Sequence, residues 1–111
     1  MSMHRMAVIG DHDSIMGFKA LGVSVFPVHD GQERAVILRR IGKEDYGVIF
    51  ITENIGEEML PVVQEFATKP LPAILYIPNN QGSTGIGLEK IRRIVERAVG
   101  VDIFTGKEGS Q

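Results

Sequence analysis

The sequence predicts an α/β fold: a small, four-stranded, doubly wound parallel sheet of the receiver-like Rossmann type, with a mobile C-terminal helix. Four short apolar runs, rich in β-branched residues, alternate along the chain with segments of helical periodicity. Apolar strands that alternate with helices are typical of a parallel sheet covered on both faces. The spacing fits the strand order 2-1-3-4 with right-handed crossovers.

The first predicted strand is Met6–Ile9, a continuous apolar run of the kind found in strands that are buried on both faces. A helix is expected over Ser14–Ala20. Asp13 or Ser14 is placed to cap its free N–H groups, and Gly22 is expected to end it.

The second strand is expected over Val23–Val28. Because Pro27 cannot donate a ladder hydrogen bond, this strand is expected at an edge of the sheet. The segment Gln32–Ile41 suits a helix that is closed by Gly42.

The second half of the chain repeats the alternation. Val48–Thr52 is the most strongly apolar β run in the sequence, and Ala73–Ile77 is the fourth predicted strand. Between them, a helix is expected over Ile55–Ala67 with Asn54 as its cap. Pro61 is expected near the first turn of that helix or at a kink.

The last helix is expected over Leu88–Val99, ended by Gly100. The chain is therefore divided as follows: 1–78 a receiver-like α/β domain, 79–87 a glycine-rich tether, 88–104 the C-terminal helix and its end, and 105–111 a disordered tail.

The composition excludes several classes of protein. A chain of 111 residues with 43% hydrophobic residues can bury one core without metal or disulfide help. A net charge of -2 gives no electrostatic basis for binding nucleic acid. The absence of cysteine excludes disulfides and thiolate chemistry. No apolar run approaches the roughly 20 residues of a membrane helix, and none suits a signal peptide, so we expect a cytoplasmic protein without membrane insertion.

Polar residues follow the first strand in the segment from Gly10 to Ser14, where sites on such folds lie. Asp11 and Asp13 could hold Mg²⁺ together with Glu53, as in the acidic pocket of a signalling receiver. However, a receiver needs a phosphoacceptor aspartate after the third strand, where this chain has Glu53. The alternative is that Gly10, Asp11, Asp13 and Ser14 form only the turn and the helix cap.

No catalytic residue or cofactor is predicted. His4, His12 and His29 have no spacing typical of metal ligands, and no residue is placed to orient one of them as a base. The sequence also lacks the nucleophile-elbow and zinc-protease motifs. We therefore expect a protein that is not an enzyme and that binds no metal.

Three glycines, Gly82, Gly85 and Gly87, precede the last helix, as they would in a phosphate-binding loop. The loop lacks the lysine and the hydroxyl residue of a P-loop, and it follows the fourth strand instead of the first. A nucleotide-binding module is thus the weaker alternative. A connection from Pro78 to Gly87 is long for a compact fold, where about 2–6 residues are usual, so the three glycines are expected to act as a hinge.

The last helix carries an apolar stripe at helical spacing, formed by Leu88, Ile91, Val95 and Ala98 and widened by Ile94 and Val99. Charged residues fill its other side. Such a stripe normally packs on its own sheet, but it can also lie against the helix of a partner. The spacing alone leaves both possibilities open.

Three blocks of sequence resemble the F subunit of the V-type and A-type rotary ATPases. The first is Ala7–Val23, with its Gly-Asp, acidic-hydroxyl, Gly-Phe and Gly-Val pairs. The second is Tyr46–Met59, in which an apolar strand ends in Thr-Glu, and the third is Pro72–Pro78. The order of these blocks carries the resemblance, which spans about Met6–Phe104. Asn79–Gly87 departs from the pattern of the family.

The resemblance implies a non-catalytic component of the central rotor stalk that needs no cofactor. Its expected partners are the coiled coil of the D subunit and the catalytic hexamer of A and B subunits, and its expected role is to modulate ATP-driven rotation coupled to ion transport. The residues expected to bind the D subunit are Leu88, Ile91, Arg92, Ile94, Val95, Ala98 and Val99.

Overall fold

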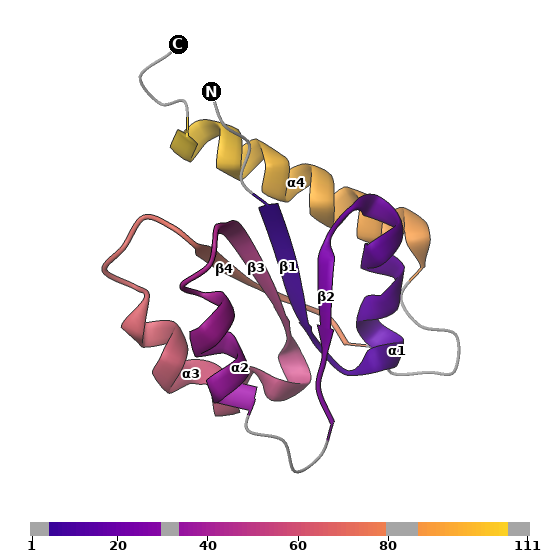
Figure 1. Ribbon diagram of the computed structural model, residues 1–111. Coiled ribbons are helices and arrows are strands. Elements are labelled where there is room, and N and C mark those ends of the chain that lie inside the picture. The colour runs from indigo at the N-terminus through magenta and orange to yellow at the C-terminus, as the bar shows by residue number, and fades with distance from the viewer. Residues whose placement is uncertain (1–4, 30–33, 80–86, 107–111) are drawn as a thin grey trace.

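The computed structural model describes residues 5–29, 34–79 and 87–106. Its centre is a parallel sheet of four strands in the order β2-β1-β3-β4 (Figure 1). The predicted fold class and strand order are therefore confirmed. The strands are β1 (Arg5–Gly10), β2 (Ser24–Pro27), β3 (Tyr46–Thr52) and β4 (Ala73–Ile77).

The helices lie in two layers on either side of this sheet. They are α1 (His12–Ile15), the 3₁₀ segment η1 (Met16–Leu21), α2 (Arg34–Ile41), the 3₁₀ turn η2 (Glu53–Ile55), α3 (Gly56–Glu65) and α4 (Leu88–Gly106). Helices α2 and α3 cover one face, whereas α1, η1 and α4 cover the other (Figure 1).

Strand β3 is buried along its whole length because both of its faces are covered. Ile49 and Ile51 belong to the core under α2 and α3, and Val48 and Phe50 belong to the core under η1 and α4. Strand β2 lies at the edge of the sheet, as the proline at position 27 predicts.

The first helix begins earlier than the sequence indicates. Asp11, not Asp13 or Ser14, precedes its first residue, and the Asp11 side chain makes no capping hydrogen bond to the helix backbone. After one turn the helix tightens into η1, which ends at Gly22. Gly22 has a φ of 82°, a left-handed conformation that favours glycine, so this predicted helix end is confirmed.

The third helix is also entered differently from the prediction. Asn54 is not its cap; it lies inside η2, and its Nδ2 donates to Oδ1 of Asp11 at 3.4 Å. Ile55 takes the capping position without a side-chain hydrogen bond. Pro61 lies inside α3, in its second turn.

The prediction that the last helix ends at Gly100 is wrong, because α4 continues to Gly106. A glycine inside a helix costs only about 0.5–1 kcal/mol relative to alanine, which does not outweigh the propagation of a long helix. Thr105 and Gly106 are helical instead of part of a disordered tail, and the remaining residues of that tail lie outside the described part of the chain.

Candidate functional site

The apolar stripe of α4 packs on the sheet of its own chain. Ile91, Val95 and Ala98 are buried there, in the core cluster that contains Phe18 of η1 and Phe50 of β3. The structure thus realises the packing of an ordinary surface helix, which was one of the two possibilities that the spacing left open. We call this arrangement the docked state of α4.

The other residues proposed to bind a partner are less covered in the docked state. Ile94 and Val99 are half-buried at the border of the core. Leu88, in the first turn of α4, is 50% exposed, and Arg92 is also exposed to solvent. The seven residues therefore divide into a buried row and an accessible row on the same helix.

The exposed side of α4 carries charged side chains that form only long ion pairs with one another. Oxygens of Glu89 lie 3.9 Å from nitrogens of both Arg92 and Arg93. Ion pairs at this distance between exposed side chains contribute little to stability and leave the charges open to other partners.

Of the three predicted hinge glycines, Gly82 and Gly85 lie outside the described residues. Gly87 is described, and a Cβ atom at this position would meet nothing within 4 Å. Among the described glycines only Gly22 has a positive φ, so the φ of Gly87 is not in the left-handed region. At Gly87, therefore, the docked state itself does not require glycine.

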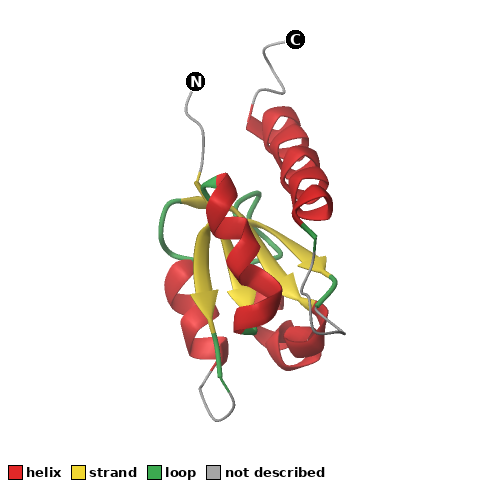
Figure 2. Ribbon diagram, turned by 90° about the vertical axis from the view of Figure 1, so that its right-hand side faces the viewer, coloured by secondary structure: helices red, strands yellow, loops and turns green. Residues whose placement is uncertain are grey.

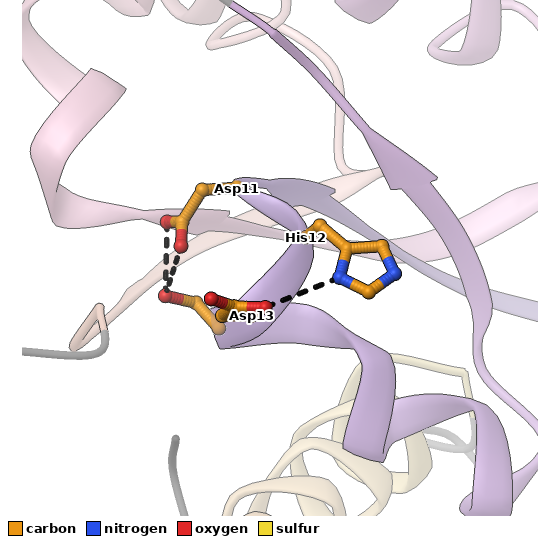
Figure 3. A network of polar contacts seen from close by, with 4 residues as sticks. Asp11, His12 and Asp13 are labelled. Carbon is orange, nitrogen blue, oxygen red and sulfur yellow. Dashed lines mark hydrogen bonds and ion pairs between the residues drawn. The ribbon is translucent and has the colours of Figure 1, made fainter. Parts of the chain in front are cut away.

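The turn after β1 is organised around the carboxylate of Asp11 (Figure 3). The hydroxyl group of Ser14 donates to both oxygens of Asp11, at 2.9 and 2.8 Å, and Ser14 is buried. Asp13 is turned toward solvent, where its Oδ1 lies 3.3 Å from Nδ1 of His12. Asp11 and Ser14 thus hold the turn together, and Asp13 stands apart from them.

The neighbouring end of β3 is closed against this turn. A Cβ atom at Gly10 would overlap both Cγ2 and Oγ1 of Thr52, so the two strand ends are packed without space between them. Glu53 follows Thr52 and is exposed. Within the described ranges, no group of three or more His, Asp or Glu side chains is placed to hold a metal ion. The donors proposed for a receiver-like Mg²⁺ site are therefore present, but they are not gathered.

A groove that the sequence does not predict lies between β4 and α4. It has a volume of about 410 Å³, an apolar floor and a row of cations formed by Lys90, Arg93 and Arg97. The signal in the sequence is the spacing of these cations, which places them on one side of a helix. Which element faces this row depends on how α4 lies on the sheet, and the sequence does not contain that information locally.

None of the helices in the described ranges is both long and apolar enough to cross a membrane.

Comparison with known proteins gives a consistent result. Residues 6–95 match the model of the family described as ATP synthase (F/14-kDa) subunit. The F subunit of the V-type ATP synthase of Fusobacterium nucleatum is 44% identical over 102 residues, which cover 92% of this chain and 97% of the relative. The F subunit of the A-type ATP synthase of Thermococcus sibiricus is 36% identical over 105 residues, covering 89% of this chain and 97% of the relative.

The F subunit of the A-type ATP synthase of Methanosphaera stadtmanae is a more distant match, 30% identical over 100 residues, with coverage of 88% and 94%. The region matched by the family model includes nearly the whole sheet and the buried residues Ile91 and Val95 of α4. The resemblance found in the sequence therefore extends across the fold. The chain is a member of the family of F subunits of V-type and A-type ATP synthases.

Proposed function

We propose that this chain is a non-catalytic part of the central rotor stalk, on the cytoplasmic side of the membrane. In this proposal it binds the coiled coil of the D subunit through α4 and modulates the rotation that couples ATP turnover in the A and B hexamer to ion transport. In this proposal catalysis takes place in other subunits, and this chain contributes a helix that binds a partner.

The proposal rests on one observation: α4 is longer than the part of the sheet on which it packs. The helix has 19 residues, and its C-terminal turns extend past the strands (Figure 2). At its other end, Leu88 is 50% exposed although it continues the apolar stripe. At Leu88 the stripe is only partly covered by the chain itself, which leaves apolar helix surface for a partner helix.

Two modes of binding are compatible with this geometry. In the docked state a partner reaches Leu88, Arg92 and the half-buried edge of the stripe. Ile91, Val95 and Ala98 become accessible only when α4 leaves the sheet. Release exchanges burial on the sheet for burial on the partner, at roughly 1.5–3 kcal/mol per large side chain in either place. The two states can therefore differ by only a few kcal/mol, which is the condition for a helix that switches position.

The direct test is capture of the D subunit of the same ATPase by the whole chain. Substitution of Ile91 or Val95 by Asp would also damage the chain's own core, so the decisive variant is Leu88→Asp, at an accessible position. We expect it to weaken the capture of the D subunit by about tenfold, because an unpaired carboxylate would be buried at the contact.

A matched control is Val36→Asp on α2, which lies on the opposite face of the sheet. Val36 is an apolar residue that is also 50% exposed, so both substitutions place a carboxylate on a similarly open helix surface. If Leu88→Asp and Val36→Asp captured the D subunit equally well, α4 would not be the binding element.

A further inference from the structure

The groove between β4 and α4 has the size and lining of a small-molecule site. Leu75 of β4 and Ile94 of α4, both half-buried, form the accessible part of its floor, and the buried side chains of Phe50, Ile77 and Ala98 lie beneath them. Its volume of about 410 Å³ falls in the range of about 300–1,000 Å³ that is usual for ligand pockets. An apolar floor of this kind favours a ligand with a flat or extended apolar body.

The wall of the groove that α4 forms is cationic. Lys90, Arg93 and Arg97 lie at successive turns of the helix, so their charged groups form one row of about 10 Å along the groove. Among the described residues, neither Lys90 nor Arg97 has a hydrogen-bond or ion-pair partner, and Arg93 has only Glu89 at 3.9 Å. The row therefore offers open donors to an anionic group.

The opposite side of the groove is the open edge of the sheet. Strand β4 is the last in the order, and no further strand of the described chain pairs with its outer edge. Tyr76 borders the groove with its main chain, because its ring lies on the other face of the sheet, close to Gly56 of α3. The groove is therefore open along β4, where a ligand can enter it. Guanidinium groups stack on flat rings as well as bind anions, so the two arginines favour a planar ligand.

We propose that this groove binds one small organic anion with a planar apolar body and a carboxylate, sulfonate or phosphate head. The body lies on the half-buried side chains of Leu75 and Ile94. The head is bound by Arg93 and Arg97, with Lys90 at the end of the row. The area is too short for a long helix, since the cationic row spans about two helical turns, so we assign it to a small ligand and not to a protein partner.

Binding at this place has a consequence for α4. The groove exists only in the docked state, because the sheet and the helix each contribute half of it. A ligand that binds one state of a protein and not the other shifts the equilibrium toward the first state. The organic anion therefore holds α4 on the sheet. In this respect the inference rests on the proposed function, in which α4 is the helix that a partner recruits.

The test uses the isolated whole chain and three probes: anilinonaphthalene sulfonate, its uncharged analogue phenylnaphthylamine, and inorganic phosphate. Amide chemical shifts locate the binding. We expect the sulfonate to shift the amides of β4 and of residues 90–98, and we expect the analogue without the charge and the phosphate without the apolar body each to bind about tenfold more weakly or worse.

The decisive variant replaces both arginines of the row, Arg93→Gln and Arg97→Gln. It should weaken the binding of the sulfonate by about tenfold or more, since two charge-assisted contacts are lost. Arg40→Gln, an exposed arginine on the other face of the molecule, is the matched control and should leave the affinity unchanged. Equal affinity in the double variant, or shifts that appear on α2 and α3 instead, would overturn the assignment of the site.

The effect on α4 is read by amide hydrogen exchange with and without the sulfonate. Saturation should slow exchange in α4 relative to β2, which is remote from the groove. Unchanged exchange in α4 with a ligand bound in the groove would refute the coupling. None of these measurements involves the D subunit, so failure to capture it would refute the proposed function and leave the result on the groove intact.

Discussion

Ile91 of α4 lies directly against Gly17 of η1. A Cβ atom at residue 17 would be 2.6 Å from Cδ1 of Ile91, so the absence of a side chain at Gly17 allows the helix to approach η1 this closely. Ile91 is 1% exposed and is one of the largest fully buried side chains of the described chain. The contact between these two residues is therefore a natural point at which to alter the docked state.

A larger side chain at residue 17 should loosen α4. In Gly17→Leu the new side chain occupies the space of Ile91, and overpacking of this kind costs typically about 1–3 kcal/mol. We expect faster amide exchange in α4 and, if the D subunit binds the released stripe, capture of that partner that is about tenfold tighter. Unchanged affinity for the D subunit would show that the partner binds α4 while it remains docked.

The two ends of the stripe should respond differently to truncation. Ile91→Ala removes a buried side chain and should lower the free energy of unfolding by about 2–5 kcal/mol. Leu88→Ala, at a half-exposed position of the same stripe, should change it by about 0.5 kcal/mol or less. Urea unfolding of the two variants measures the difference. Equal and small effects would mean that α4 is not docked in solution.

Two glycine substitutions should act in opposite directions. At Gly42 a Cβ atom would overlap Cζ of the Phe66 ring, so Gly42→Ala should destabilise the chain by about 1–3 kcal/mol. At Gly100, inside α4, a Cβ atom would meet nothing within 4 Å, so Gly100→Ala should stabilise the chain by about 0.5–1 kcal/mol. Thermal unfolding checks both. A destabilising Gly100→Ala would contradict the continuous helix.

An ion pair between α2 and α3 should make part of the stability depend on pH. The guanidinium group of Arg39 donates to both oxygens of Glu65, at 3.1 and 2.8 Å. These hydrogen bonds, together with the positive charge of Arg39, lower the pKa of the Glu65 carboxyl group. Because the native carboxylate binds protons more weakly than the unfolded one, the stabilisation is complete above the ordinary pKa of glutamate, about 4.3, and declines as the pH falls through the lower native value.

The corresponding experiment compares the wild type with Glu65→Gln in urea at neutral and at acidic pH. The difference in stability should be small, since both side chains are largely exposed, and it should vanish at the acidic pH. Glu44→Gln, at an exposed glutamate with no ion pair among the described residues, is the control and should show no such dependence. A difference that grows with acidity would contradict the lowered pKa.

The turn after β1 should not bind Mg²⁺ as a signalling receiver does. Both oxygens of Asp11 already share the hydroxyl hydrogen of Ser14, and Asp13 is turned away from Asp11. Titration with millimolar Mg²⁺ should therefore leave the amide shifts of Asp11 and Glu53 unchanged, as it should in an Asp11→Asn control. A saturable shift at Asp11 that the control lacks would restore the receiver hypothesis.

The Asp11→Asn control is informative by itself. The amide of asparagine has one oxygen where the carboxylate has two, so it accepts less well from Ser14, and a loss of about 1 kcal/mol in stability is expected from the weakened turn. Its effect on folding separates the structural role of Asp11 from any role in binding.

Much of the fold follows from local sequence. The four apolar runs, Gly22 and Pro27 predict the strands, the end of the first helix and the edge position of β2, because strand burial, left-handed backbone and the missing N–H group act within a few residues. For a sheet of the order β2-β1-β3-β4, right-handed crossovers, which are almost invariant, place the helix after β1 on one face and the helices after β2 and β3 on the other.

The helix boundaries were less predictable because they depend on contacts from elsewhere in the chain. Asn54 has the chemistry of a cap, but its side chain donates to Asp11, which is distant in sequence. Gly100 has the chemistry of a helix end, but it does not interrupt α4.

The sequence by itself determined the family, the parallel sheet and the apolar stripe of the last helix, since these are properties of residue order and spacing. Only the tertiary structure decided where that stripe lies. The hydrophobic effect is not directional, so an apolar stripe with this spacing can pack on its own sheet or on the helix of a partner. Which of the two it packs on depends on the shape of the surface that it meets. Gly17 supplies that shape by admitting Ile91, and the docked helix then forms the groove with β4.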